Sequence, residues 1–310
     1  MGIKESSESQ YQEFLKNIQY LEDEGRYEVN LPWKGEYIPK SDCYGMYLKR
    51  LHQLKSRLDK DKPLLQEYDT IIKDQVKGGI IDPVLVAHET GYFLPHHGVL
   101  REDKETTKLR VVFDGSARAT KEEQSLNDCL EKGPNLVPRL FDSMINFRGF
   151  PIGLVADIEK AFHQIQIAPE DRKMLKFLWF DDINKVPPML KEYKSRRLPF
   201  GLTPSPAILS TVIRHHVSKY KNVDPEIVSL LIESLYVDDF AGGASNEDEA
   251  LYICHGSPKL MHQGGSKLRK GHSNSTHLNV NDYKRLIKKL IKWHEFSWPF
   301  IEHPFCLIGI

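Results

Sequence analysis

The stretch Tyr236-Val237-Asp238-Asp239 decides the fold, because it sets two adjacent carboxylates between two apolar runs. Leu230-Leu231-Ile232 precedes it, and Phe240-Ala241 follows it. Burying two acids in apolar surroundings is costly unless a cation or a hydrogen-bond network compensates their charge. Aspartate is well tolerated in turns. The stretch therefore predicts the turn of a β-hairpin that projects both carboxylates from one end of a sheet.

A second acidic position has the same character. The run Pro151-Ile152-Gly153-Leu154-Val155-Ala156 has the pattern of a buried strand, and it ends abruptly at Asp157. A divalent-cation site for phosphoryl transfer needs carboxylates from separate segments at one place. Two strands that each stop at an aspartate therefore predict such a metal site.

The composition is that of an ordinary globular protein. The chain has 310 residues, enough for two subdomains. Its formal net charge is zero, so overall charge does not indicate a nucleic-acid binder. Residues 259–302 are locally basic, with nine Lys and Arg against three Asp and Glu. This surplus predicts either a face that tracks a phosphate backbone or a solvated helix surface.

Cysteine usage and hydropathy predict a reduced, non-membrane setting. No apolar run is long enough to span a bilayer, and no secretory segment begins the chain. The adjacent pairs His96-His97 and His215-His216 are interpreted as surface or structural histidines. We expect reduced thiols and no structural zinc site, because four scattered cysteines are present: Cys43, Cys129, Cys254 and Cys306.

Periodicity predicts a mixed α/β protein in which strands and helices alternate. Helices are expected at residues 11–21, 42–62, 64–77, 125–130, 137–145, 205–219, 225–233, 246–261 and 282–296. Strands are expected at 92–95, 99–100, 109–113, 151–156, 175–179 and 197–199, the last two around a polar insertion. Ser205 is expected to cap the helix that it opens, with Pro206 at the first helical position.

Four segments occur in a fixed order along the chain: Arg110-Val111-Val112-Phe113-Asp114-Gly115-Ser116-Ala117, Ala156-Asp157-Ile158-Glu159-Lys160-Ala161-Phe162, Leu198-Pro199-Phe200-Gly201-Leu202-Thr203-Pro204-Ser205-Pro206 and Tyr236-Val237-Asp238-Asp239. Together they resemble the ordered motifs of a retroelement reverse transcriptase, most closely the Pao/BEL group of long-terminal-repeat retrotransposons. The similarity covers roughly residues 20–275. Four more segments resemble that group's pol polyprotein: 27–34, 94–97, 125–128 and 268–270.

The resemblance implies a right-hand polymerase fold of the α+β class. Such a fold has fingers and a ferredoxin-like palm with an antiparallel sheet, and here the thumb would be truncated. The implied domains are an N-terminal linker or helical extension (1–60), fingers (61–150, with 171–197 returning to them), a palm core with the catalytic hairpin (151–275) and a divergent basic tail (276–310).

The same resemblance implies a two-metal site. Asp157 and Asp238, with the backbone carbonyl of Ile158, would hold two Mg²⁺ ions, for which Mn²⁺ is a substitute. Asp239 would support the site electrostatically, and Tyr236 and Val237 would support the hairpin.

Six residues are implied in nucleotide binding: Arg110, Phe162, Phe200, Gly201, Arg101 and Lys270. A bulky Phe162 would exclude a ribose 2′-hydroxyl, and the Arg110 guanidinium would match the triphosphate. Non-functional alternatives stay open for four of these residues. Phe162 could serve core packing alone, and Arg110, Arg101 and Lys270 could be exposed basic residues without a ligand.

The function implied is that of an RNA-directed DNA polymerase, a nucleotidyltransferase that extends a primer 3′-OH with dNTPs. Its partners would be an RNA or DNA template with primer, with no membrane and no stable protein partner. Its location would be cytoplasmic, in a virus-like particle, or nuclear, and not secreted. Two alternatives remain: a catalytically inactive nucleic-acid-binding remnant, and a tail that binds a membrane surface or a partner.

Overall fold

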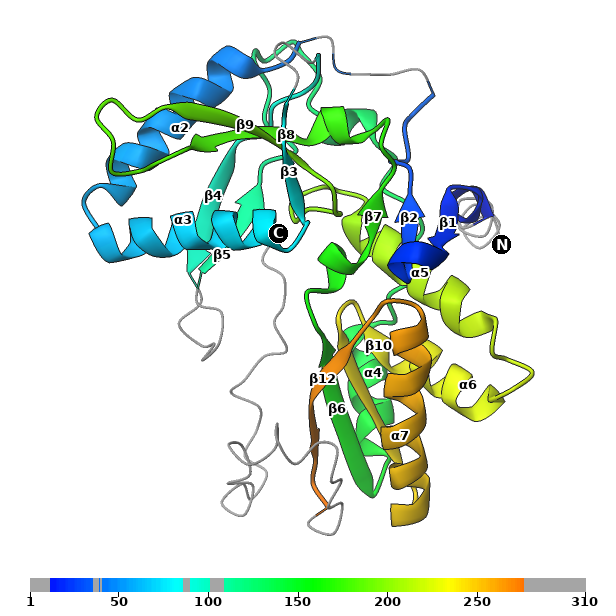
Figure 1. Ribbon diagram of the computed structural model, residues 1–310. Coiled ribbons are helices and arrows are strands. Elements are labelled where there is room, and N and C mark those ends of the chain that lie inside the picture. The colour runs from blue at the N-terminus through cyan, green and yellow to red at the C-terminus, as the bar shows by residue number, and fades with distance from the viewer. Residues whose placement is uncertain (1–11, 36–38, 40, 86–89, 101–108, 276–310) are drawn as a thin grey trace. The chain divides into compact units, whose positions relative to one another are not determined.

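The fold is mixed α/β, as the periodicity predicted. The computed structural model describes residues 12–35, 39, 41–85, 90–100 and 109–275. The chain divides into two compact units (Figure 1). The first comprises Met1–Val137, Lys160–Lys221 and Gln263–Ser266; the second comprises Pro138–Glu159, Asn222–His262 and Lys267–Ile310.

The second unit is built on an antiparallel four-stranded sheet in the order β10-β11-β6-β12. Its strands are β6 (Ile152–Ile158), β10 (Leu235–Tyr236), β11 (Asp239–Ala244) and β12 (Leu268–Ser273), and its helices are α4 (Leu140–Arg148), α6 (Pro225–Ser234) and α7 (Glu247–Gln263). Asp224 caps α6 by accepting a hydrogen bond from the Ile227 amide. Gly256 of α7 leaves room for the Ile227 side chain.

The first unit contains two three-stranded sheets, in the orders β1-β2-β7 and β3-β9-β8, and a β4–β5 hairpin. The strands are β1 (Ile18–Leu21), β2 (Arg26–Val29), β3 (Ile81–Pro83), β4 (His96–Leu100), β5 (Leu109–Phe113), β7 (Gln166–Ile167), β8 (Lys176–Phe180) and β9 (Leu190–Ser195). The helices are α2 (Tyr44–Leu58), α3 (Lys62–Lys77) and α5 (Ser205–Ser218). Short 3-10 segments are η1 (Glu22–Glu24), η2 (Asn127–Cys129), η3 (Ala161–Gln164) and η4 (Arg172–Leu175).

Aromatic packing forms the core of the first unit around β8. Tyr68 of α3 stacks on Trp179 with ring centroids 4.8 Å apart, and both side chains are fully buried. The Trp179 indole donates to the buried carboxylate of Asp69 at 2.9 Å. Such a buried polar contact is tolerable because the indole N–H has a hydrogen-bond acceptor.

Several element predictions were wrong. The helix expected to reach Leu21 gives way at Ile18 to β1, because residues 18–21 pair with β2. Residues 197–199 are not a strand; β9 lies instead inside the segment interpreted as a polar insertion. Ser205 does not cap α5, since its hydroxyl donates to the Pro199 carbonyl at 3.0 Å. The helix from 42 is also shorter than expected and ends at Leu58.

Three other expectations concern thiols, membranes and the tail. The described cysteines, Cys43, Cys129 and Cys254, are free thiols, as expected. Among the described helices, none combines the length and apolar character needed to cross a bilayer. The helix expected at 282–296 and the basic tail lie outside the described residues.

His96 is a buried structural histidine. Its Nε2 lies 3.1 Å from the Leu178 carbonyl, which can only accept, so Nε2 carries the proton and Nδ1 accepts from the Tyr68 hydroxyl at 2.6 Å. Burial lowers the pKa of His96 to about 4. The folded protein therefore holds the ring neutral.

We expect the free energy of unfolding to fall as the pH drops from about 6.5 to about 4. Over that range the unfolded chain binds a proton that the folded His96 does not. Urea unfolding at stepped pH measures this, and His96→Gln should show a shallower fall than wild type. His97→Gln is the matched control, because His97 is exposed; a flattening equal to that of His96→Gln would contradict the assignment.

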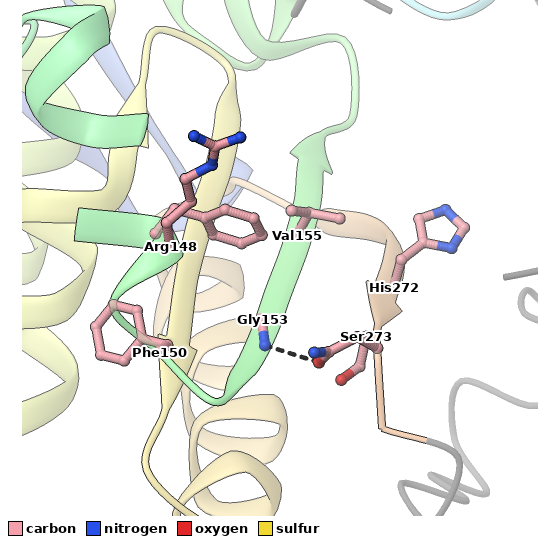
Figure 2. A pocket seen from close by; sticks show the side chains of 8 residues that line it. Arg148, Phe150, Gly153, Val155, His272 and Ser273 are labelled. Atoms are coloured by element: carbon pink, nitrogen blue, oxygen red, sulfur yellow. Dashed lines mark hydrogen bonds between the residues drawn. The ribbon is translucent and has the colours of Figure 1, made fainter. Parts of the chain in front are cut away.

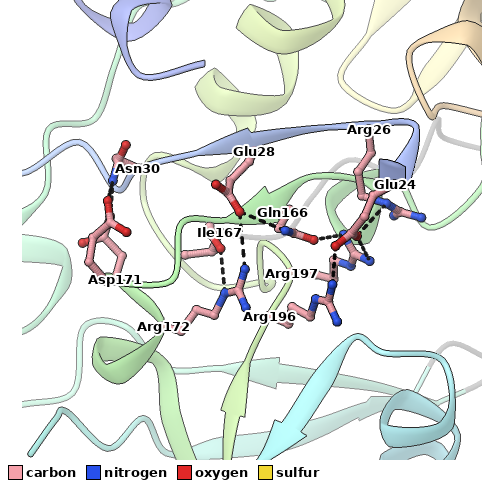
Figure 3. Close-up of polar contacts among 11 residues, drawn as sticks. Glu24, Arg26, Glu28, Asn30, Gln166, Ile167, Asp171, Arg172, Arg196 and Arg197 are labelled. Carbon is pink, nitrogen blue, oxygen red and sulfur yellow. Dashed lines mark hydrogen bonds and ion pairs between the residues drawn. The ribbon is translucent and has the colours of Figure 1, made fainter. Parts of the chain in front are cut away.

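Glu24 of η1 links β2 to the chain after β9 within the first unit (Figure 3). Its carboxylate pairs with Arg196, with Arg197 at 3.1 Å and with Arg26 at 3.6 Å. Arg197 is buried and also donates to Gln166 at 2.6 Å. Burial alone would raise the pKa of Glu24, but Arg196 and Arg197 outweigh it and lower that pKa.

Glu24→Gln is expected to lower the free energy of unfolding by about 1–3 kcal/mol, because it leaves half-buried guanidinium groups without a counter-charge. Urea unfolding at neutral pH measures the change. Glu13→Gln is the control: the Glu13–Lys16 pair is exposed and should contribute less than about 0.5 kcal/mol. Equal effects of the two substitutions would show that the cluster adds no stability.

Candidate active site

The sheet of the second unit brings the acids of β6 and the hairpin together. Asp157 and Asp239 are directly paired across β6 and β11, so their side chains leave the same face of the sheet. The backbone carbonyl of Asp238 accepts a hydrogen bond from the Ile158 amide at 2.8 Å. The three acids therefore lie at one end of one sheet. The face of the sheet that carries the Asp157 and Asp239 side chains is called the acid-bearing face.

The hairpin turn is strained at Val237. Tyr236 pairs with Asp239, which leaves Val237 and Asp238 as a two-residue turn. Val237 has φ 57°, at the position that glycine usually occupies in a type II′ turn. A β-branched residue at positive φ is an outlier that costs of order 1–3 kcal/mol and tends to occur at functional sites.

Two basic side chains, Arg269 and Lys267, bind the acids at the end of β6. Arg269 of β12 is directly opposite Asp157 in register. The Arg269 Nε donates to Asp157 Oδ2 at 3.1 Å, and its Nη1 donates to Glu159 Oε1 at 3.3 Å. Lys267 pairs with the other oxygen of Glu159 at 3.7 Å. Asp157 is thus bound by the Arg269 guanidinium and not only by solvent.

The donor set fits a magnesium ion. No three His, Cys, Asp or Glu side chains among the described residues form a ready metal cage. Magnesium does not need one, since it binds through one or two carboxylates and takes its other ligands from water and substrate phosphates. Asp157 Oδ1 is buried and has no hydrogen-bond partner among the described residues, which is costly without a further ligand. The residues that would hold the metal are Asp157 and Asp238.

A pocket of about 460 Å³ opens on the same face of the sheet (Figure 2). Val155 lines it and lies two residues before Asp157 on β6, so both side chains point to one side. His272 lines the opposite wall, and burial lowers the pKa of its ring although the Asp157 carboxylate opposes that shift. Asn274 closes one end by accepting from the Gly153 amide at 2.9 Å. The pocket therefore lies on the acid-bearing face, and none of the three acids is among its lining residues.

In the first unit the structure brings together three residues implied in nucleotide binding. The Phe162 and Phe200 rings meet edge to face, with centroids 4.8 Å apart. The Arg110 guanidinium lies over the Phe200 ring at 5.8 Å. Phe162 is buried, so packing explains part of its presence.

The Phe200-Gly201 segment is held by backbone contacts. The Phe200 carbonyl accepts from the Phe113 amide at 3.0 Å. Gly201 has φ 105°, and a Cβ there would overlap the Phe113 carbonyl oxygen. Asn127 Oδ1 accepts from the Thr203 amide at 2.9 Å, and its Nδ2 donates to the Gly201 carbonyl at 3.3 Å. Glycine is therefore required here by the close approach of the Phe113 carbonyl of β5.

Of the remaining implied residues, Arg101 lies outside the described residues. Lys270 sits on β12 at φ 52°, where the strand register shifts. Sequence reasoning assigned no role to Arg269 or Asn127, although both lie in segments that carried the resemblance. Their contacts depend on strand register and loop approach, which no local pattern encodes. The functional roles of all these residues stay predictions.

Comparison with known proteins identifies the family. A family model described as Reverse transcriptase (RNA-dependent DNA polymerase) matches residues 104–293. No curated protein matches the chain. The solved structures that it resembles include the foamy viral protease-reverse transcriptase dRH in complex with ds DNA, at 20% identity and a TM-score of 0.42. That alignment covers 65% of this chain and 30% of the viral one, so the chain spans less than a third of that relative.

The matched segment includes Asp157, Asp238 and Asp239 and takes in more than half of the chain. The chain belongs to the reverse transcriptase (RNA-dependent DNA polymerase) family.

Proposed function

We propose that this chain carries an RNA-directed DNA polymerase domain that adds deoxynucleotides to a primer 3′-OH on an RNA or DNA template. The observation that carries the proposal is the pairing of Asp157 with Asp239 beside a strained turn that presents Asp238. The palm core of a right-hand polymerase, expected at 151–275, would include the four-stranded sheet of the second unit. Transfer of a nucleotide is mainly a problem of positioning and charge stabilisation, and clustered carboxylates on a rigid sheet suit it.

Asp157 and Asp238 would bind magnesium, with Asp239 adding negative charge on the same face. When bound, the metal would lower the pKa of the primer hydroxyl and neutralise charge on the leaving pyrophosphate. The protein itself supplies carboxylates in fixed positions, since the pairing of β6 with β11 and β12 holds these strands in register. Arg110 would bind the triphosphate through its planar guanidinium, which matches phosphate oxygens.

The finer origin that we propose is a retrotransposon of the Pao/BEL type. Support comes from the segments 27–34, 94–97, 125–128 and 268–270, which resemble that group's pol polyprotein. Two of these segments have structural roles: Asn127 holds the Phe200-Gly201 segment, and Arg269 binds Asp157.

Primer extension on an RNA template with Mg²⁺ or Mn²⁺ tests the activity. The wild-type chain should extend the primer with dNTPs, and Asp238→Asn should not, although its fold should be unchanged by circular dichroism. Equal extension by both proteins would place the activity elsewhere. No extension by either would favour a remnant that only binds nucleic acid.

Phe162→Val is expected to reduce the preference for dNTPs over rNTPs by roughly 10–100-fold, the range that a few missing contacts in a pocket can produce. The smaller side chain would admit a 2′-hydroxyl. The measurement is the ratio of single-nucleotide incorporation rates, which does not change with the fraction of folded enzyme. Phe180→Val is a control, since Phe180 is equally buried in β8; an unchanged ratio in Phe162→Val would reduce that residue to core packing.

A further inference from the structure

Arg269 is positioned against the proposed metal ligand by the sheet itself. It is the direct partner of Asp157 across β12 and β6, and opposite residues in an antiparallel pair share a face. Both side chains are only about a quarter exposed, Arg269 at 27% and Asp157 at 26%. The contact is therefore built into the strand pairing and is not a chance meeting of long surface side chains.

A β-bulge fixes this arrangement. Arg269 pairs with Asp157 and His272 pairs with Val155, so two residues of β12 stand opposite the single residue Ala156. Lys270, in that extra step, has φ 52°. Bulges of this kind redirect side chains next to active sites. Here the bulge keeps both Arg269 and His272 on the acid-bearing face, which a regular strand would not allow.

We propose that Arg269 is a resident counter-charge of the metal site. Its guanidinium binds Asp157 Oδ2 and Glu159 Oε1 and so offsets the repulsion between carboxylates before a cation arrives. Asp157 Oδ1, buried and unpartnered among the described residues, is the atom left to the cation. This inference rests on the proposed function, because it takes Asp157 to be a metal ligand.

The consequence is a reduced affinity for divalent cations. A positive charge bonded to one oxygen of a carboxylate repels a cation on the other oxygen, and in a half-buried site that repulsion is only partly screened. The protein would thus bind the catalytic metal weakly by itself and more firmly when the nucleotide triphosphate brings further negative charge. Arg269 is a positioning residue in this scheme, since it acts through Asp157.

The test is equilibrium binding of Mn²⁺ alone to the full chain, with no nucleotide or nucleic acid present. The electron paramagnetic resonance signal of the free ion measures how much Mn²⁺ is bound. Arg269→Gln should bind Mn²⁺ about tenfold more tightly than wild type. Arg269→Lys keeps the charge and should bind within about threefold of wild type. Asp157→Asn should abolish the gain when it is combined with Arg269→Gln. Melting temperatures with and without Mn²⁺ report on folding, and the ion should stabilise Arg269→Gln more than wild type.

The matched control is Lys267→Gln, which removes the same charge from a lysine that pairs with Glu159 and is 66% exposed. It should change Mn²⁺ affinity by less than about threefold, because solvent screens it. Arg269→Gln binding no more tightly than Lys267→Gln, or more weakly than wild type, would overturn the inference. Primer extension by the wild type decides the proposed function separately, so failure of one is distinguishable from failure of the other.

Discussion

Replacing Asp157 by asparagine is expected to reduce primer extension by about a thousandfold or more, which corresponds to ~4 kcal/mol of lost transition-state stabilisation. Asparagine has the same shape, but it lacks the charge that holds a divalent cation. Asp157 is paired with Asp239 on one neighbouring strand and with Arg269 on the other. These fixed pairings leave no room for another acidic side chain to take the place of Asp157. Single-turnover extension at saturating Mg²⁺ measures the effect.

Asp248→Asn is the matched control for this change. Asp248 lies exposed in the first turn of α7, in the same unit as the acids. Its extension rate should stay within about twofold of wild type, since an exposed charge there contributes only a few tenths of a kcal/mol. A loss below about tenfold in Asp157→Asn would remove Asp157 from the metal-binding role.

Gly201→Ala is expected to lower the free energy of unfolding by about 4 kcal/mol or more. Few kinds of single substitution cause a loss of that size. Two penalties combine. The backbone has φ 105°, and the new Cβ would overlap the backbone carbonyl oxygen of Phe113. Neither the loop nor β5 can retreat easily, because the Phe113 amide donates to Phe200 and Asn127 holds the Gly201 carbonyl. Urea unfolding at neutral pH measures the loss.

Gly79→Ala separates the two penalties. Gly79 also has positive φ, 61°, but a Cβ there would meet nothing within 4 Å. Its cost should therefore be only the conformational term, about 1–2 kcal/mol. If both alanine variants lose the same stability, the close approach to Phe113 is not a constraint.

The acidic end of the sheet was predictable because its pattern is short and local. An apolar run that ends at Asp157, and two acids between apolar arms at Tyr236–Asp239, each define one strand end by themselves. The structure continues β6 only one residue past Asp157 and forms the expected hairpin. Helices with clear stop signals were equally predictable: α3 ends at Lys77, before Gly78.

The errors came where distant pairing overrides local preference. Residues 18–21 have a helical pattern, yet they form β1 because β2 offers a strand edge. Strand β9 is polar, and it exists because β3 and β8 flank it. Ser205 turned out to bond the Pro199 carbonyl, a partner that propensity for capping cannot anticipate.

The same limit applies to the site. Arg269 could be recognised as part of a motif, but its partner depends on the bulge at Lys270, which shifts the register by one residue. A slip of one residue moves a side chain to the opposite face. The contact between Arg110 and Phe200 likewise needs two segments far apart in the chain to approach each other. Sequence supplied candidates, and strand pairing decided which of them meet.

The parallel pairing of β2 with β7 has a consequence for synthesis on the ribosome. Glu28 and its partner Gln166 are 138 residues apart, so at ~5–20 residues per second translation separates them by roughly 7–30 s. During that interval the β1–β2 ribbon has an open hydrogen-bonding edge, which invites pairing with another nascent chain. A recombinant fragment trimmed to residues 104–293 would lack the ribbon altogether and leave the edge of β7 bare, so soluble expression should favour fragments that retain residues 18–29.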